Sequence, residues 1–365
     1  MLLYICVTIW FFFLLLAGLR PGSVIAAESW PELPGEKEEK RNQFIVLILS
    51  GLSFLVLWFL TAFRSRAIGN DVENYLVYFQ MFSNGPVDQP RVEIGYQLLN
   101  YFIWQISSDG HFFLLSMATI MYCGIGVYFY KFSKNPAVVV CLFFSCFFSV
   151  YTSILRQGMA MVIALYGYQL LKNKKRILAA LVFLLATSFH TTAFLCFLLF
   201  LDFDILKKQW FVLGITAACV IASLSGVMKS VVNIVFPKYT HYFEGQYAGS
   251  GWLAISVYLL TYIIFYLLVS KSLDENNKSD NKIATNFTLL LLLTAFGYAV
   301  NLFERAGEYF LLIGITELPN VLYRGKVKHF RFWLLVIGTF YLILFVLILI
   351  YRPGWNHLYP YEFWH

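Results

Sequence analysis

The chain has 365 residues, of which 60% are hydrophobic and only 13% charged, and its formal net charge is +7. A soluble domain carries about twice that share of charged side chains, so the composition excludes a soluble enzyme, a disordered protein and a disulfide scaffold. It predicts instead an all-α polytopic membrane protein. A basic excess of this size usually reflects anchoring on the cytoplasmic side, and we expect no nucleic-acid partner.

The first apolar run covers residues 2–19, and a polar stretch follows at 28–43. A signal peptide normally begins with basic residues, and none precedes this run, so we expect an uncleaved first span. The other clear runs are long enough, or nearly so, to cross about 30 Å of hydrocarbon at about 1.5 Å per residue. They cover residues 44–63, 111–130, 137–154, 157–171, 210–228, 251–270, 283–303, 306–322 and 332–351.

One apolar stretch, residues 177–206, is too long for one upright span and too short for two. Basic clusters flank it at 172–176 and 207–208, and polar residues interrupt it around His190. Lys and Arg concentrate in cytoplasmic loops, so both flanks belong on the same side of the membrane. We therefore predict a short hairpin with His190 near its apex.

With this hairpin, the sequence predicts about 12 helical segments in a single transmembrane domain over residues 1–365, with the N- and C-termini outside. Three outer regions follow. They are the loop 64–110, which includes an amphipathic interfacial helix at 96–106, the aromatic loop 229–250 and the C-terminal tail 352–365. Outer aromatic residues often form only an interface belt, and the alternative is that they stack on sugar rings.

Ionisable residues at helix ends are the sharper signal. Arg156 lies between two apolar runs with almost no loop, where a charge is costly and needs a partner. The predicted outward basic residues are mostly arginines, whose planar fork binds phosphate oxygens with two hydrogen bonds. They are Arg64, Arg66, Arg91, Arg156, Arg305 and Arg352. This set favours a diphosphate site at the outer surface. The alternatives are that Arg156 only extends to the membrane surface, that His190 is structural, and that Glu304 and Arg305 form a structural ion pair.

No motif for a metal or cofactor is evident. The chain has no Asp-x-Asp pair, no glycine-rich phosphate loop and no cluster of His and Cys ligands. Its six cysteines all lie within apolar runs and are typical of small buried residues. We therefore expect no metal and no cofactor.

The same residues carry a family resemblance over about residues 44–365. The segments Gly69-Asn70-Asp71, Glu93-Ile94-Gly95-Tyr96, Leu155-Arg156-Gln157, Phe189-His190-Thr191 and Tyr359-Pro360-Tyr361 follow one another in the chain. In this order they resemble the EpsG family, the Wzy-like polymerases of bacterial exopolysaccharide and capsule. One departure is that Val72 follows Asp71 where the family often has tyrosine.

The resemblance implies a metal-independent glycosyltransferase, related to O-antigen polymerases, in the bacterial plasma membrane. Its donor and acceptor would both be polyprenyl-diphosphate-linked oligosaccharides, and its partners would be the lipid bilayer, a chain-length regulator and a flippase. Arg156 and Arg305 would stabilise the leaving diphosphate. His190 or Glu93 would be the general base, with Glu304 or Asp71 as further candidates. The expected binding residues are Arg64, Arg66, Asp71, Tyr75, Arg91, Tyr96, Gln157, Tyr309 and Tyr361.

Three other classes stay open on the sequence alone. The first is a flippase or transporter of lipid-linked oligosaccharide, although no internal repeat is visible and the charges gather near one face. The second is another outer-face transferase, either a polysaccharide ligase or an acyltransferase, which would differ in its acceptor. The third is a structural membrane subunit, which would leave Arg156 without a role.

Overall fold

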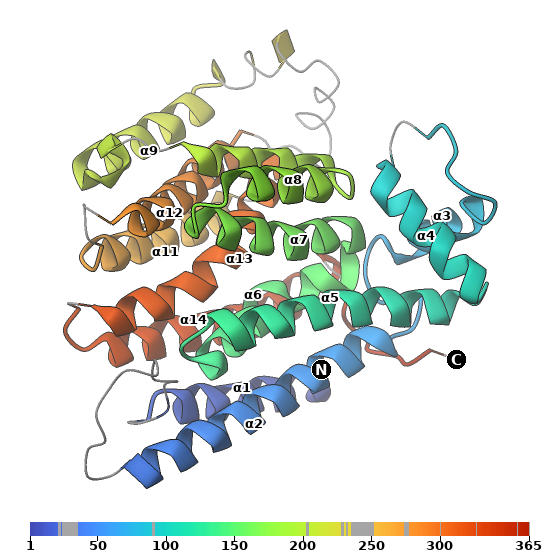
Figure 1. Ribbon diagram of the computed structural model, residues 1–365, viewed down its shortest axis with the longest axis horizontal. Helices are drawn as coiled ribbons and strands as arrows, with labels where there is room; N and C mark the ends of the chain where they lie inside the picture. The colour runs from blue at the N-terminus through green and yellow to red at the C-terminus, as the bar shows by residue number, and fades with distance from the viewer. Residues whose placement is uncertain are drawn as a thin grey trace. The chain divides into compact units, whose positions relative to one another are not determined.

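A computed structural model of the chain shows a helical protein (Figure 1). It describes residues 1–20, 23, 36–89, 92–201, 204–227, 230, 233–234, 252–273, 277–299, 301–325, 327–355 and 357–364. In this part of the chain every named element is a helix, and extended backbone pairs only at an isolated antiparallel bridge between Arg64 and Phe363. The predicted all-α fold is confirmed.

Five helices in the described ranges are long and apolar enough to cross a membrane. These spans are Lys40–Ala62, Gly110–Phe132, Pro136–Ser153, Leu253–Ser270 and Phe330–Tyr351. Each coincides with an apolar run predicted from the sequence, so the prediction of a polytopic membrane protein is also confirmed. The outside location of both termini stays a prediction.

The chain divides into two compact units. Unit 1 comprises residues 1–166, 184–191 and 328–365, and unit 2 comprises 167–183 and 192–327. In the described part of the chain, two α-helices contribute residues to both units. They are α7 (Leu155–Lys172) and α8 (Arg176–Thr187).

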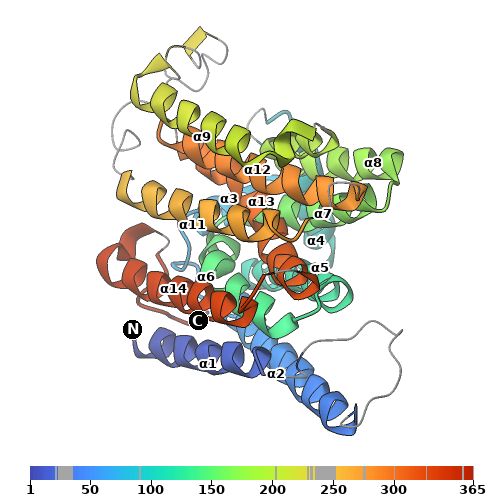
Figure 2. The same cartoon turned by 90° about the vertical axis from the view of Figure 1, so that its left-hand side faces the viewer.

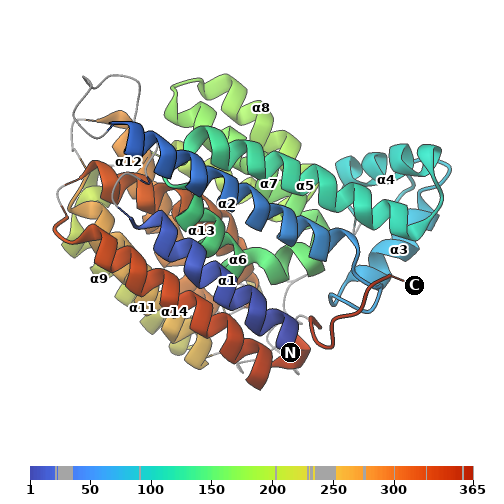
Figure 3. The ribbon, with the colours of Figure 1, turned by 90° about the horizontal axis from the view of Figure 1, so that it is seen from below.

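Unit 1 is built around α6, which is apolar on all sides. Helices α1, α2, α5 and α14 pack against it, and Figure 3 shows α1 lying between α2 and α14. The bounds of these helices are Leu2–Gly18 for α1, Glu36–Ala62 for α2, Gly110–Phe132 for α5, Pro136–Ser153 for α6 and Phe330–Tyr351 for α14. A helix that is hydrophobic all round must be buried, and most side chains of α6 are.

The start of α6 is fixed by its own sequence. Pro136 occupies the first turn, where no backbone donor is needed, and the side chain of Asn135 accepts a hydrogen bond from the amide of Val138. The Asn135 amide also donates to the carbonyl of Gly18 at 2.7 Å. This side chain therefore caps α6 and holds the end of α1 against it.

Two shorter helices, α3 (Val72–Met81) and α4 (Ile94–Ile106), pack on each other and on α5 (Figure 1). Helix α4 is amphipathic, as predicted for residues 96–106. It buries Tyr96, Gln97, Asn100 and Ile103 and exposes Ile94, Leu98, Phe102 and Ile106. Its location at a membrane interface stays a prediction.

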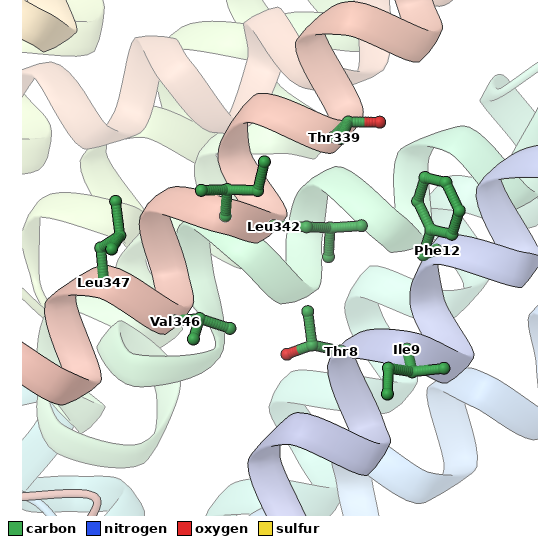
Figure 4. A pocket seen from close by; sticks show the side chains of 8 residues that line it. Thr8, Ile9, Phe12, Thr339, Leu342, Val346 and Leu347 are labelled. Atoms are coloured by element: carbon green, nitrogen blue, oxygen red, sulfur yellow. The ribbon is translucent and has the colours of Figure 1, made fainter.

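Helices α1 and α14 also border a groove of about 290 Å³ (Figure 4). Six apolar side chains and two threonines line it. The Thr8 hydroxyl donates to the carbonyl of Tyr4 at 2.7 Å, within its own helix. The lining has no charged group, so this groove suits hydrocarbon and not a sugar or a phosphate.

Unit 2 is centred on α12 (Lys278–Gly297). Helices α9 (Gln209–Leu224), α11 (Trp252–Ser270) and α13 (Asn301–Arg324) pack against it (Figure 2). Asn277 caps its start by accepting a hydrogen bond from the amide of Ser279.

The predicted hairpin is confirmed. Helix α8 runs to Thr187, and after a short turn that includes His190 the chain continues as the 3₁₀ helix η1 (Thr191–Phe200). The two arms lie side by side, because Arg176 at the start of α8 donates to the carbonyl of Phe200 at 3.3 Å. The ring of Phe183 also packs on that of Phe200. A 12-residue helix is only about 18 Å long, too short to cross a bilayer.

Candidate functional site

Arg156 lies in the first turn of α7, directly after α6 ends at Ser153. Its side chain is mostly buried, with 20% exposed. A positive charge at a helix N-terminus is unfavourable, because the helix dipole is positive there. Glu93 supplies the compensating charge, since its Oε2 lies 2.8 Å from Nη1 of Arg156.

Glu93 occupies the N-cap position of α4 and brings three segments together. Its Oε1 accepts hydrogen bonds from the backbone amide and the hydroxyl of Thr191, both at 2.9 Å. The same oxygen lies 3.3 Å from Nδ1 of His190. Thr191 is the first residue of η1, so the carboxylate also meets a backbone donor that the helix itself leaves unpaired. One carboxylate thus joins α4, α7 and the apex of the hairpin.

The start of α4 is docked directly on the hairpin. The amide of Gly95 donates to the carbonyl of Ser188 at 2.8 Å. A Cβ atom at position 95 would lie only 2.8 Å from that oxygen, so no other residue fits there without movement of the backbone. Gly95 therefore allows the close approach that brings Glu93 to His190.

The charges around Glu93 keep it ionised. Burial alone would raise the pKa of this carboxyl group, but the interaction with His190, the charge of Arg156 and the backbone amide of Thr191 outweigh burial and lower the pKa to about 2. A carboxylate with so low a pKa is a weak base at neutral pH. The arrangement suits Glu93 to orient and balance its neighbours.

Two tyrosines border the same cluster. Tyr75 of α3 and Tyr96 of α4 are buried, and their ring centroids lie 5.8 Å apart. Burial raises the pKa of Tyr75 to about 12, the charge of Asp71 adds to this effect, and nearby Arg156 acts in the opposite direction. Gln157, which follows Arg156, is also buried.

Two expected binding residues have structural partners. Arg64 is fully buried and donates to the carbonyls of Thr61 and Ile68. The hydroxyl of Tyr361 donates to the carbonyl of Leu60 at 2.8 Å. The last carbonyls of a helix have no partner within it, so these side chains complete the end of α2. In this structure the Arg64 guanidinium has no surface on which a diphosphate could bind.

The C-terminal tail pairs with the segment that follows α2. The amide of Ser65 donates to the carbonyl of Glu362 at 2.8 Å, and the amide of Trp364 donates to the carbonyl of Phe63 at 2.9 Å. The Trp364 ring stacks on His111 with centroids 5.2 Å apart. The aromatic tail is thus part of unit 1, and these aromatic residues have partners within the protein.

Three further expected residues belong to unit 1, namely Arg66, Asp71 and Arg91. Arg66 forms a two-bonded ion pair with Glu73, at 2.6 and 2.9 Å, and both side chains are exposed. Asp71 occupies the N-cap position of α3. Arg91 lies outside the described residues, as does most of the aromatic stretch 229–250.

The remaining expected residues belong to unit 2. Glu304 and Arg305 lie at the start of α13, which begins at Asn301 after α12 ends at Gly297. The predicted junction between spans at 304–305 is therefore wrong by a few residues, and both side chains are on a helix. Tyr309 is buried, and its hydroxyl accepts a hydrogen bond from that of Thr192 at 3.3 Å.

Three residues of the Glu93 cluster are not among the site residues expected from the sequence. They are Gly95, Ser188 and Thr191, whose partners lie about a hundred residues away in the chain. Gly95 and Thr191 stand in the segments that resemble the family, and Ser188 lies two positions before His190, so their places in the chain were the available signal. Among the described residues, no group of three His, Cys, Asp or Glu side chains could hold a metal ion.

The fold and the Glu93 cluster define an all-helical polytopic membrane protein with a polar site of arginine, carboxylate and histidine where helices begin. The model of the EpsG family matches residues 47–363, which include the whole cluster, and the chain belongs to this family. No curated protein and no solved structure matches the chain.

Proposed function

We propose that this protein polymerises lipid-linked oligosaccharide repeat units at the outer face of the bacterial plasma membrane. In this reaction a sugar hydroxyl of the acceptor unit attacks the anomeric carbon of the donor glycan. The bond from that carbon to the polyprenyl diphosphate breaks, and the diphosphate leaves with the bonding electrons. The hydroxyl proton passes to a base. Membership of the EpsG family supports this assignment.

The observation that carries the proposal is the grouping of Glu93, Arg156 and His190 in one cluster. Of the three, His190 is the best base, because an arginine stays protonated and the pKa of the Glu93 carboxyl group is lowered to about 2. We assign to it the proton of the acceptor hydroxyl. Its side chain is 22% exposed, so a substrate can reach the ring.

Arg156 is the cation that we assign to the leaving diphosphate. Its guanidinium faces Glu93 and interacts with Tyr75, and 20% of the side chain is exposed, where a guanidinium can bind phosphate oxygens. Cations placed where negative charge develops stabilise the transition state. Arg305 of unit 2 is a second candidate for this role, because the sequence places it among the predicted outward arginines.

The test is complementation of cells that lack this protein with the wild type, His190→Gln or Arg156→Ala, at matched membrane levels. Arg331→Ala is the control, because Arg331 is an exposed residue at the start of α14 and lies outside the cluster. We expect the two cluster variants to accumulate single repeat units at the outer face, while the control forms polymer. Repeat units that stay at the cytoplasmic face would indicate a flippase, and normal polymer in both variants would contradict the proposal.

A further inference from the structure

We infer that Glu93 is a positioning residue that holds the His190 ring with its proton on Nδ1, so that Nε2 receives the proton of the acceptor hydroxyl. This inference rests on the proposed function and goes one step beyond it. It assigns the two nitrogens of one ring to different tasks. It also explains why a carboxylate that is itself a weak base stands beside the histidine.

The geometry of the ring supports this assignment. Nδ1 of His190 is buried, and Oε1 of Glu93 lies 3.3 Å from it. An ionised carboxylate can only accept hydrogen bonds, so the nitrogen that faces it must carry the hydrogen. The distance is within hydrogen-bonding range, but the Nδ1–H direction is not aligned with Oε1 in this structure, so the pair is an ionic contact and not a formed hydrogen bond. Catalytic hydrogen bonds are commonly poorly aligned without substrate and tighten when it binds. Since Nδ1 is buried while 22% of the side chain is exposed, the exposed surface belongs to other atoms of the side chain.

The carboxylate is fixed in position from two sides. Arg156 holds Oε2, and the amide and hydroxyl of Thr191 hold Oε1. The backbone bond between Gly95 and Ser188 keeps the two segments in register. Glu93 therefore cannot turn away from His190 without breaking several hydrogen bonds at once.

The charged and titratable groups around the pair come from three helices. Glu93 stands at the start of α4, Arg156 on α7 opposes it, and Tyr75 of α3 and Tyr96 of α4 lie near Arg156. When His190 accepts the proton it becomes an imidazolium, and the carboxylate of Glu93 at 3.3 Å stabilises that charge. Loss of the carboxylate charge should therefore remove this stabilisation of the imidazolium.

Glu93→Gln is the sharpest variant, because it keeps the shape of the side chain. Glutamine has a single acceptor oxygen, whereas Glu93 meets donors at both of its oxygens. If the oxygen serves Arg156, the NH₂ group faces His190 as a donor and favours the wrong tautomer. If the oxygen instead faces His190, the NH₂ group opposes Arg156. In either orientation the ring loses its charged partner.

The experiment measures kcat and KM for elongation of a lipid-linked repeat unit by purified protein across pH, with wild type, Glu93→Gln, Glu93→Asp and His190→Gln. We expect Glu93→Gln to lower kcat by about 10²–10⁴-fold with KM little changed. The acidic limb of its pH profile should shift to lower pH, because the imidazolium loses its charged partner. Glu93→Asp should restore part of the rate. If Glu93 had a purely structural role, Glu93→Gln would lower the rate but leave the acidic limb of the pH profile at its wild-type position.

A readout that does not need an active variant is ¹⁵N NMR of the histidine rings in the wild-type protein. The chain has only six histidines, and His190→Gln assigns the signal. We expect the proton on Nδ1 when the ring is neutral. A proton on Nε2 of the neutral ring would overturn the inference. A Glu93→Gln variant with the wild-type rate and the wild-type pH profile would also overturn it. Either outcome would leave the proposed function standing. Wild-type elongation by His190→Gln would instead contradict the base that the proposed function assigns, and no elongation by the wild-type protein would contradict the proposed function itself.

Discussion

Oε2 of Glu93 and Nη1 of Arg156 lie 2.8 Å apart, although the two residues are 63 positions apart in the chain. Both side chains are largely buried. The pair joins the start of α4 to the start of α7 within unit 1. Removal of either partner leaves the other charge without its main compensation.

This contact predicts strong coupling between the two positions. Glu93→Ala and Arg156→Ala should each lower the free energy of unfolding by about 3 kcal/mol, because each leaves a partly buried charge uncompensated. The double variant should lose less stability than the sum of the two single losses, and the difference, the coupling energy, should be roughly 1–2 kcal/mol. Thermal unfolding in detergent for the wild type, both single variants and the double variant measures this coupling. Additive losses would show that the two residues do not interact.

Position 95 should tolerate no side chain. In Gly95→Ala the new Cβ would meet the Ser188 carbonyl, which would push the start of α4 away from the hairpin. We expect the variant to reach the membrane and lose most polymer formation. Gly51→Ala is the matched control, since nothing lies within 4 Å of a Cβ at position 51. Equal activity of the two variants would refute the docked arrangement.

Acid should weaken the cluster through Glu93. Its pKa is lowered from 4.5 to about 2 in the folded protein, so the ionised carboxylate favours the folded state above about pH 4.5. This stabilisation is lost as the pH falls from 4.5 toward 2. The gap in melting temperature between the wild type and Glu93→Gln should therefore narrow by about half between pH 6 and pH 3. The exposed Glu362→Gln serves as the control, and a gap of the same size at both pH values would contradict the prediction.

The C-terminal tail should contribute to stability and not to catalysis. Tyr361→Phe removes the hydrogen bond to the Leu60 carbonyl, and we expect a loss of about 1 kcal/mol. Tyr359→Phe, in an exposed part of the same tail, should leave the melting temperature unchanged. The rate of polymer formation per folded molecule should stay at the wild-type level in both variants. A selective loss of rate in Tyr361→Phe would instead return this residue to the substrate site.

The helical layout was largely predictable, because apolar runs and basic loops reflect the physics of a bilayer. The flanking charges of the stretch 177–206 were enough to predict a hairpin, and α8 and η1 form it. The boundary between α12 and α13 was misplaced. The apolar runs predict the junction of the two spans at Glu304 and Arg305, whereas the break comes before Asn301 and both residues lie on the helix that follows.

The candidate site was predictable only as separate residues. Glu93, Arg156 and His190 each stood out as ionisable groups at helix ends, but their mutual contacts depend on tertiary packing that a single sequence does not reveal. Arg64 and Tyr361 show the converse. Their residue types favoured a contact with phosphate or sugar. In the structure, however, both side chains donate hydrogen bonds to backbone carbonyls at the end of α2. Unpaired helix ends compete with ligands for the same polar side chains.

The most direct test of the account is elongation by purified protein in lipid vesicles that contain only a polyprenyl-diphosphate-linked repeat unit. The products would be sized by gel electrophoresis and mass spectrometry. The account predicts a ladder of polymer and released polyprenyl diphosphate with the wild type, and neither with His190→Gln at the same melting temperature. A ladder of equal length with His190→Gln would contradict the assigned base, and transbilayer movement of the repeat unit without any ladder would contradict the polymerase itself.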